Sequence, residues 1–467
     1  MVESRPDTIA ALSTPPGSGG IAILRVSGPA AHAMLRRLFH PWPAQLQYFH
    51  LYLGYLCDPV TGQRLDQVLI TLMPSGRSYT GEDMGEIHCH GGVYISRKIL
   101  TLLFSLGALP AQPGEFTRKA YLSGRLDLVQ AEAVAALISS ESEAAMKAAA
   151  SQLAGGLSDF VNEQLDLVNQ LLAALEVEID FPSEEGANYK NAGVVLPPLM
   201  KFHTKLTDLL SSYQRGRLLQ SSFKIALVGR PNVGKSSVLN ALLNEDRVLV
   251  SEFAGTTRDV ISAPLEIAGI KVEISDTAGL DQPRDELEMM GMERTRKCLE
   301  QAALILLILD QSRPLNDKDE EIYGLIKGRP HLIVLNKQDL NPALSSAGLC
   351  RHFSYNGPLL SCIAARGRVD VKAVIEGIGN FIKSRVDVAG DMLLISQQRH
   401  FDYLNKAAQA LDRALALFKD GEPLLLDMLA EELHLIRSQL LALTGRNVES
   451  ASEDLLELVF SQFCIGK

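Results

Sequence analysis

The spacing of apolar residues changes along the chain and divides it into stretches of different predicted secondary structure. In the first stretch, short apolar runs such as 21–26 and 68–72 stand between turn-forming residues. Helices are expected there around 30–38 and 93–105. This mixture of strands, turns and short helices predicts an α+β domain over residues 1–118.

Helical periodicity takes over from about residue 120. The stretch 126–150 is dense in Ala, Glu and Leu, which are good helix formers. Apolar residues recur at helical spacing over 160–179, until Phe181-Pro-Ser ends the pattern, and another helix is expected over 196–219. Long helices are expected again near the end of the chain, at about 397–418, 423–443 and 449–461.

Between these helical stretches, residues 221–383 alternate strands with helices. Because helix-rich sequence flanks this block on both sides, we expect it to be inserted into a discontinuous helical domain. The predicted division is therefore 1–118, 119–220, 221–383 and 384–467. The fold class is multidomain, with an α/β domain, an α+β domain and a helical domain.

Composition limits the classes of function. The 467 residues are 46% hydrophobic and 21% charged, as in an ordinary globular protein. A net charge of −10 argues against a general nucleic-acid coater, although local basic patches can still hold a specific RNA. The six cysteines show neither zinc spacing nor a disulfide framework, and no apolar run is long enough to span a membrane, so a cytoplasmic protein is expected. His88-Cys-His90 could suggest a metal, but no second ligand cluster accompanies it.

The strand expected over 223–228 runs directly into Gly229-Arg-Pro-Asn-Val-Gly-Lys-Ser236. This is the G-x-x-x-x-G-K-S pattern of a phosphate-binding loop in its strand-to-helix context. The glycines allow backbone N–H groups to turn toward the phosphates, and Lys235 is expected to meet the β and γ phosphates. The Ser236 hydroxyl is expected to bind Mg²⁺, with Thr257 of the first switch as the second hydroxyl ligand.

The later motifs of a nucleotide-hydrolysing domain follow in order. A strand ends in Asp276-Thr-Ala-Gly279, where Asp276 is expected to hold the Mg²⁺ shell and the Gly279 N–H to sense the γ-phosphate. The next residue, Leu280, cannot orient water as the glutamine at that place in Ras-like enzymes does. The acidic segment 285–288 offers candidates for that role, or it is a solvated helix start.

The base is read by Asn336-Lys-Gln-Asp339, which follows an apolar strand. The Asp339 carboxylate can accept hydrogen bonds from two guanine donors that adenine lacks, so GTP rather than ATP is the expected substrate. A fifth motif is expected at Ser361-Cys-Ile363, although it departs from the usual Ser-Ala-Lys. Together the motifs predict a P-loop GTPase domain with a Ras-like, doubly wound sheet.

The chain also carries motifs that general GTPases lack. They are Thr14-Pro-Pro-Gly-x-Gly-Gly with Arg25-Val-Ser-Gly, Tyr79-Thr-Gly-Glu-Asp-x-x-Glu86, His90-Gly-Gly, Pro113-Gly-Glu-Phe-Thr-Arg, Arg125-Leu-Asp-Leu-x-Gln-Ala-Glu and the ending Phe463-Cys-Ile-Gly-Lys467. With these motifs, essentially the whole chain resembles the MnmE (TrmE) family of tRNA modification GTPases.

The resemblance implies a function and partners. Members of this family work with the FAD-containing protein MnmG in a heterotetramer or larger assembly. They add an aminomethyl or carboxymethylaminomethyl group to carbon 5 of the wobble uridine of certain tRNAs. 5-Formyltetrahydrofolate or another tetrahydrofolate derivative supplies the one-carbon unit. The N-terminal domain is expected to bind folate and to hold a homodimer together.

The resemblance also implies a folate site at Arg25, Glu86, Arg125 and Lys467. The family commonly has lysine where this chain has Arg125, which keeps the charge and changes the contact geometry. Arg and Lys suit the carboxylates of a folate tail, and Glu86 suits the paired donors of its pterin ring. From the residues alone, these four could equally be surface ion-pair residues. Cys464 resembles a functionally important cysteine of the family.

Family positions further imply a K⁺ site and a water-positioning residue. The K⁺ ligands would be Asn232, Ser251, Phe253 and Thr256, and Mg²⁺ would be bound by Ser236 and Thr257. Glu288 would position water and act in catalysis with Lys235. The predicted GTP contacts are Asn232, Val233, Gly234, Lys235, Ser236, Ser237, Ser251, Thr256, Thr257, Asp276, Thr277, Ala278, Gly279, Asn336, Lys337, Asp339 and Ser361.

Two other readings compete with this one. A GTP-switched ribosome-assembly factor of the Era or EngA type would share the nucleotide block, but it would lack the N-terminal motifs and the Cys-Ile-Gly-Lys end. A helical scaffold with a decaying GTPase domain conflicts with the intact Lys235, Asp276 and Asp339.

Overall fold

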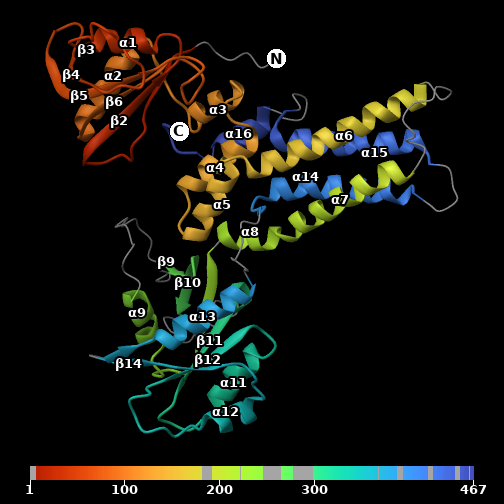
Figure 1. Cartoon of the computed structure of the whole chain (residues 1–467). Helices are drawn as coiled ribbons and strands as arrows, with labels where there is room; N and C mark the ends of the chain where they lie inside the picture. Colours follow the sequence, from red (N-terminus) through yellow and green to blue (C-terminus); the bar gives the residue numbers. More distant parts are fainter. Residues whose placement is uncertain are drawn as a thin grey trace. The chain divides into compact units, whose positions relative to one another are not determined.

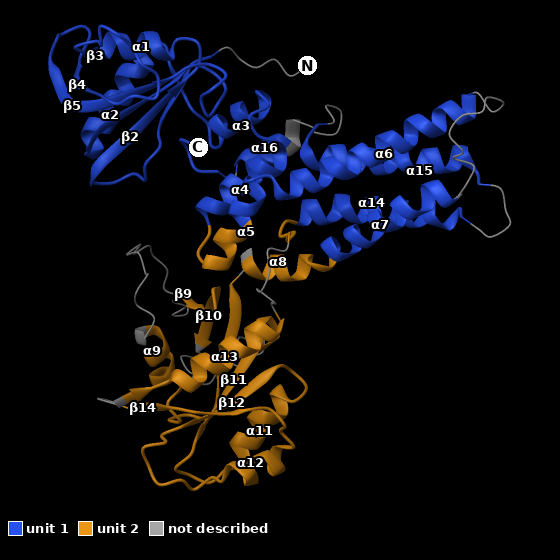
Figure 2. Ribbon diagram, in the orientation of Figure 1, with its two compact units in different colours: residues 1–139, 149–210, 398–467 blue, residues 140–148, 211–397 orange. Residues whose placement is uncertain are grey.

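The computed structural model forms two compact units (Figures 1 and 2). The first comprises 1–139, 149–210 and 398–467, and the second comprises 140–148 and 211–397. The structure describes residues 7–180, 192–220, 222–245, 264–276, 298–365, 368–385, 393–418, 424–446, 453–461 and 463–467. The second unit therefore interrupts the first in sequence, while the four predicted boundaries stay predictions.

An N-terminal sheet lies in the first unit. Its strands are β1 (Ile9–Leu12), β2 (Gly19–Ser27), β3 (Phe39–His40), β4 (Tyr52–Cys57), β5 (Arg64–Met73), β6 (Met84–Gly91) and β7 (Leu109–Pro110). Within the described residues they form a seven-stranded sheet in the order β3-β4-β5-β6-β2-β1-β7. Neighbouring strands pair antiparallel except β1 and β7, which pair parallel.

Helices α1 (Ala31–Leu38) and α2 (Val93–Ser105) bury a common core against this sheet. Both helices match the expected positions. Along β2, Leu24 and Val26 are buried among the core residues, whereas Arg25 between them is only partly buried. Since side chains alternate between the two faces of a strand, Arg25 lies on the face opposite the core.

The rest of the first unit is helical. Its helices are α3 (Glu115–Leu122), α4 (Leu128–Ile138), α6 (Gly156–Asp180), α7 (Ala192–Ser211), α14 (Gln398–Ala416), α15 (Leu426–Thr444) and α16 (Glu453–Ser461), together with the end of α5 (Glu143–Leu153). Helix α4 begins with a capping box between Asp127 and Gln130.

One helix prediction needs correction. The stretch 126–150, expected to favour helix, forms two helices, because α4 ends before a serine-rich segment at 139–142 and α5 begins after it. The helix expected over 196–219 begins earlier, at Ala192, and is replaced from Tyr213 by α8 (Tyr213–Gln220). Serine favours helix ends over helix interiors because its hydroxyl competes for backbone hydrogen bonds.

The second unit contains a mostly parallel sheet covered by helices (Figure 1). Its strands are β8 (Phe223–Val228), β9 (Pro264–Ile267), β10 (Ile270–Asp276), β11 (Leu304–Asp310), β12 (His331–Asn336) and β13 (Leu359–Ser361), and a small pair is formed by β14 (Ile363–Ala365) and β15 (Arg368–Asp370). Its main helices are α9 (Lys235–Glu245), α11 (Asp317–Ile326), α12 (Ser346–Phe353) and α13 (Lys372–Arg385). The sheet order, among the residues described, is β13-β12-β11-β8-β10-β9, and β9 alone pairs antiparallel. This is the expected doubly wound arrangement, with β8 near the middle.

The start of α5 packs on this sheet. The Ala144 N–H donates to the Gly269 carbonyl at 3.2 Å, and Lys271 forms an ion pair with Glu141. Ala144 is also part of the apolar core of the second unit. The segment 140–148 therefore belongs to the nucleotide unit, although it lies far from it in sequence.

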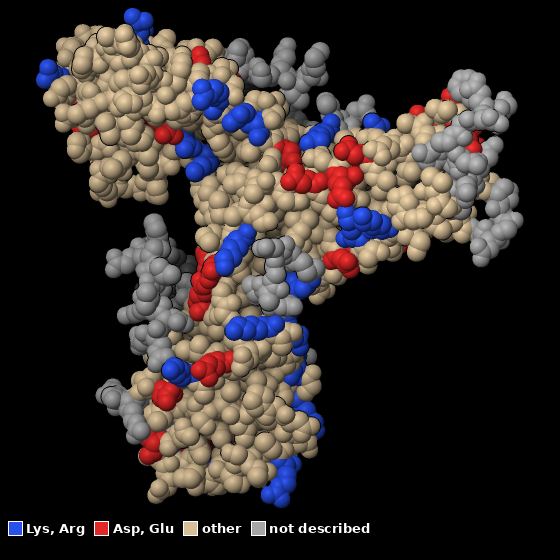
Figure 3. All heavy atoms as spheres, in the orientation of Figure 1, with Lys and Arg blue, Asp and Glu red and all other residues tan. Residues whose placement is uncertain are grey.

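Acidic and basic side chains are interspersed on the visible face of both units (Figure 3). This pattern agrees with a chain that has 45 basic and 55 acidic residues. None of the described helices combines the length and the apolarity that crossing a bilayer requires.

Candidate nucleotide and folate sites

The phosphate-binding loop lies where strand β8 gives way to helix α9. Register places the end of β10, at Asp276, beside Leu227 of β8. The backbone turns through positive φ at Gly229 (153°), Asn232 (66°) and Gly234 (100°). At Gly234 a Cβ atom would clash with the side-chain amide of Asn336, so only glycine fits there. The loop expected from the motif is therefore present in the structure.

Lys235 directs its ammonium group back into this loop. The residue is 5% exposed, and Nζ donates to the carbonyls of Gly229 at 2.5 Å and Arg230 at 3.1 Å. Ser236 and Ser237 follow it on the exposed first turn of α9. The charge of Lys235 is thus held at the helix N-terminus, where backbone N–H groups also favour an anion.

Asn336 joins the phosphate loop to the fifth motif. Its amide Nδ2 donates to the Val233 carbonyl at 2.8 Å, and its Oδ1 accepts from the Ala364 N–H at 3.2 Å and from Cys362 Sγ at 3.5 Å. Asn336 is 1% exposed. Its observed contacts therefore fasten two loops together, and its predicted contact with GTP stays a prediction.

Lys337 has a similar bridging position. Its Nζ donates to the Asn232 carbonyl at 3.0 Å and lies 2.7 Å from Asp310 Oδ2. Burial alone would raise the pKa of Asp310, but hydrogen bonds from Lys337 and Ser312 hold it below its ordinary value. Asp339, two residues farther along, is exposed. The carboxylate expected to read guanine is therefore accessible to a ligand.

The fifth motif lies beside Asn336. Strand β13 ends at Ser361, and the Cys362 N–H donates to the Leu335 carbonyl at 2.9 Å. Burial raises the pKa of the Cys362 thiol to about 12, so this cysteine stays a neutral thiol. The identity of the motif residues that contact guanine stays a prediction.

A buried ion pair ties the phosphate loop to helix α11, and the sequence did not reveal it. Arg230 NH1 lies 3.2 Å from Asp319 Oδ2, and Asp319 is 1% exposed. Burial raises the pKa of Asp319, while the Asn316 N–H and Arg230 oppose that rise. The capping-box spacing of Asn316 and Asp319 was readable as a helix start, but nothing local in the sequence links it to Arg230.

Several predicted site residues lie outside the described part of the chain. They are Ser251, Phe253, Thr256, Thr257, Thr277, Ala278, Gly279 and Glu288. The K⁺ site, both Mg²⁺ ligands and the water-positioning residue therefore stay predictions.

The candidate folate site begins with a cross-strand pair. Arg25 of β2 lies directly opposite Glu86 of β6, and Arg25 Nε donates to Glu86 Oε1 at 2.8 Å. The other carboxylate oxygen lies 3.2 Å from Nε2 of His88. His90 instead contacts Asp66, with 2.6 Å between Nδ1 and Oδ1. No group of three metal-binding side chains occurs among the described residues.

The C-terminus returns to this pair. Ser13 Oγ donates to the Gly466 carbonyl at 3.0 Å, and Arg25 NH1 approaches the same oxygen at 3.5 Å. Gly466 has a φ of 94°, and a Cβ there would clash with the Leu12 carbonyl. Burial lowers the pKa of Lys467, Arg25 lowers it further, and nearby Glu86 opposes both effects. The structure thus brings Arg25, Glu86 and Lys467 together, with Cys464 exposed close by.

Arg125 is placed differently. It is exposed, and its NH1 donates to the Gly76 carbonyl at 3.4 Å. Gly76 belongs to the same loop as Tyr79, whose ring centre is 6.0 Å from the guanidinium carbon of Arg25. Among the contacts of the described residues, Arg125 is joined to the loop that carries Tyr79, not directly to Glu86 or Lys467.

Comparison with known proteins covers almost the whole chain. Residues 8–125 match the family described as the GTP-binding protein TrmE N-terminus, and residues 128–464 match the MnmE helical domain. A tRNA modification GTPase MnmE from Lacticaseibacillus paracasei is 37% identical over 462 residues, which cover 99% of this chain and 98% of that protein. The protein of the same name from Moorella thermoacetica is 39% identical over 472 residues, covering 99% of each chain.

A solved structure of Era from Aquifex aeolicus is 24% identical to this chain, with a TM-score of 0.26. The match covers 43% of this chain and 69% of the Era chain, so the comparison rests on the full-length relatives.

Proposed function

Because the chain belongs to the MnmE family of tRNA modification GTPases, we propose that it is a K⁺-dependent GTPase acting in tRNA wobble-uridine modification. The observation that carries the GTPase activity is the phosphate loop, with Lys235 at its inner side and Asn336 fastening it to the base-reading segment. The full-length likeness to named tRNA modification GTPases supports the role in tRNA modification over that of an Era-type factor.

We propose further that it works with an MnmG-like FAD protein as a homodimer within a larger assembly. The product would be an aminomethyl or carboxymethylaminomethyl group on carbon 5 of the wobble uridine of certain tRNAs. A tetrahydrofolate derivative would supply the one-carbon unit. Glu86, which pairs with Arg25, suits the donor edge of a pterin, and the exposed Arg125 suits a folate carboxylate.

The residues around the phosphate loop fit Mg²⁺. Ser236 lies on the exposed first turn of α9, and the backbone of Asp276 ends the neighbouring strand β10. Both residue types carry the oxygen ligands that Mg²⁺ prefers. Mg²⁺ bound there would neutralise charge on the phosphates. Lys235 would bind the β and γ phosphates, and the exposed Asp339 would accept hydrogen bonds from guanine.

In the proposed mechanism, hydrolysis does not use an arginine finger from this loop, because Arg230 is held by Asp319. Instead, Asn232 would bind K⁺ together with Ser251, Phe253 and Thr256, which would place positive charge at the phosphates. Glu288 would orient the attacking water.

Hydrolysis tests this mechanism directly. Steady-state GTP turnover should be high in K⁺ and low in Na⁺ at equal ionic strength. Glu288→Ala should retain GTP affinity and lose about 100-fold in turnover, the scale of one lost transition-state contact. Glu286→Ala, two positions away in the same acidic segment, is the matched control and should stay active. Equal rates in the two salts, or a fully active Glu288→Ala, would reject this mechanism and leave GTP binding standing.

The role in tRNA modification has its own test. Nucleoside analysis of tRNA from cells that lack this protein should show loss of the carbon-5 aminomethyl-type wobble uridines. A normal nucleoside profile would contradict the proposed pathway, whatever the outcome of the GTPase assay.

A further inference from the structure

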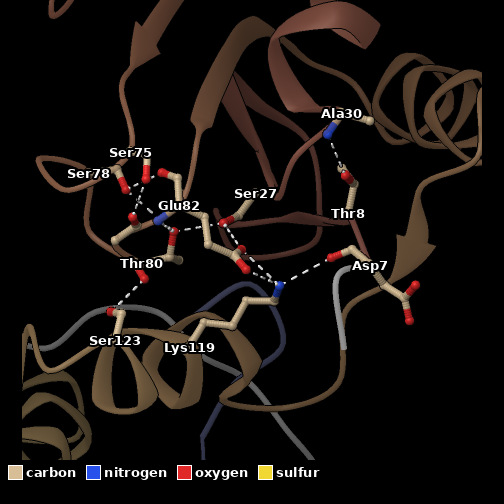
Figure 4. A network of polar contacts seen from close by, with 11 residues as sticks. Asp7, Thr8, Ser27, Ala30, Ser75, Ser78, Thr80, Glu82, Lys119 and Ser123 are labelled. Atoms are coloured by element: carbon tan, nitrogen blue, oxygen red, sulfur yellow. Dashed lines mark hydrogen bonds and ion pairs between the residues drawn. The ribbon is translucent and has the colours of Figure 1, made fainter. Parts of the chain in front are cut away.

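A network of polar contacts joins the loop 74–83, here called the anchored loop, to strand β2 and helix α3 (Figure 4). At its centre, the Glu82 carboxylate accepts hydrogen bonds from Ser27 Oγ at 3.1 Å and from Lys119 Nζ at 2.9 and 2.8 Å. Thr80 Oγ1 lies 2.7 Å from Ser27 Oγ. Ser27 and Thr80 are fully buried, so the hydroxyl groups of the network are shielded from solvent.

Lys119 contributes every proton of its ammonium group to this network. Two go to Glu82, and the third goes to the Asp7 carbonyl at 3.1 Å. The Lys119 side chain is 12% exposed and that of Glu82 is 28% exposed. Since a shielded charge that loses its partner is costly, the ion pair holds the anchored loop and α3 in one arrangement.

Through Tyr79, the anchored loop contacts the Arg25–Glu86 pair of the candidate folate site. The Tyr79 hydroxyl lies 2.9 Å from Thr117 Oγ1 of α3, and burial raises the pKa of this tyrosine, so it stays a neutral phenol. The Tyr79 ring lies beside Arg25, with the guanidinium carbon 6.0 Å from the ring centre. Tyr79 therefore links the network to the Arg25–Glu86 pair.

The same loop also contacts the turn after α3, which leads to Arg125 of the candidate folate site. Ser123 Oγ donates to the Thr80 carbonyl at 2.8 Å. A Cβ at Gly81, where φ is 78°, would clash with Ser123, so the loop and the turn pack closely. Arg125 follows two residues after Ser123, and the hydrogen bond from its NH1 to the Gly76 carbonyl is long at 3.4 Å. The placement of Arg125 thus depends on the anchored loop.

We propose that Glu82 and Lys119 are positioning residues of the folate site. Their ion pair holds the anchored loop against α3, and so sets the separation between Arg125 and the Arg25–Glu86 pair. A folate carries its pterin ring and its carboxylates at opposite ends, so the groups that bind the two ends must be held at a defined separation. This inference rests on the proposed folate function.

A double-mutant cycle on the full-length protein tests the proposal. Binding of 5-formyltetrahydrofolate is measured by titration calorimetry for the parent, Lys119→Met, Arg125→Met and the double variant. We expect Lys119→Met to weaken binding about tenfold, within the range of coupling between residues of one network. In the Arg125→Met background, Lys119→Met should change affinity less than about twofold, because the group that it positions is already gone.

Three further variants separate positioning from loss of fold. Lys119→Arg keeps the charge and can bind a carboxylate with two donors, so it should retain most of the affinity. Glu82→Gln removes the charge with little change in shape and should reproduce the loss seen in Lys119→Met. Lys98→Met is the matched control: it removes a partly exposed lysine of the same domain, which lies 3.6 Å from Asp58, and should bind like the parent.

The outcomes are distinct. If Lys119→Met and Glu82→Gln both bind folate like the parent, the positioning role is overturned and the folate assignment stands. The same holds if the affinity loss of the double variant equals the product of the losses of Lys119→Met and Arg125→Met. Failure of Lys119→Arg to restore binding also counts against it. A parent protein that does not bind the folate overturns the folate assignment, and the positioning roles with it.

Discussion

Glu132 lies at the centre of a buried ion cluster in the helical part of the first unit, and its removal should destabilise that unit. The Glu132 carboxylate accepts hydrogen bonds from Arg399 Nε and NH2, both at 2.8 Å, and lies 2.5 Å from His400 Nε2. Arg399 NH1 also donates to the Leu443 carbonyl at 3.1 Å. Glu132 is 5% exposed and His400 is fully buried. The cluster therefore connects α4, α14 and the end of α15.

The size of the effect follows from the pKa of Glu132. Burial alone would raise this pKa, but His400 and Arg399 lower it from 4.5 to about 2. At about 1.36 kcal/mol for each pH unit, the difference corresponds to roughly 3 kcal/mol in favour of the folded state. Glu132→Gln would leave the partly buried Arg399 without its anion, and removing one partner of a buried pair typically costs about 3–5 kcal/mol, which is the same order. A loss of roughly 3 kcal/mol at neutral pH is expected.

The assay is denaturant unfolding followed by circular dichroism of the helices, for the parent and Glu132→Gln, at several pH values. Because the folded-state pKa is depressed, the stabilisation is fully present above pH 4.5 and is lost as pH falls toward 2. The gap between the two proteins should therefore be large at pH 7 and shrink below pH 4.5. A gap under about 1 kcal/mol at pH 7, or one that does not change with pH, would refute this reasoning.

Two other predictions concern the two sites. Asp339→Asn should weaken GTP binding and favour xanthosine nucleotides, because the carboxylate pairs with two guanine donors; competition binding measures this, and an unchanged GTP affinity would contradict it. Removal of 464–467 should weaken 5-formyltetrahydrofolate binding and spare GTP binding, because the Gly466 carbonyl contacts Ser13 and Arg25. Unchanged folate affinity in calorimetry would exclude the C-terminus from the site.

Much of the fold was predictable because its signals are local. Helix α6 was expected from apolar residues at helical spacing over 160–179, and the phosphate loop from glycines at fixed offsets between a strand and a helix. The serines at 139–142 also carry a local signal for the break between α4 and α5.

The sequence by itself determined the residue types that a nucleotide site needs, since each motif occupies a few consecutive positions. Only the tertiary structure decided which distant residues meet. Arg25 and Glu86 are 61 positions apart, Asn336 and Val233 are 103 apart, and Ser13 and Gly466 are 453 apart. No local period encodes such contacts, because they form only when strand register, burial and the path of the whole chain bring the side chains within hydrogen-bonding distance.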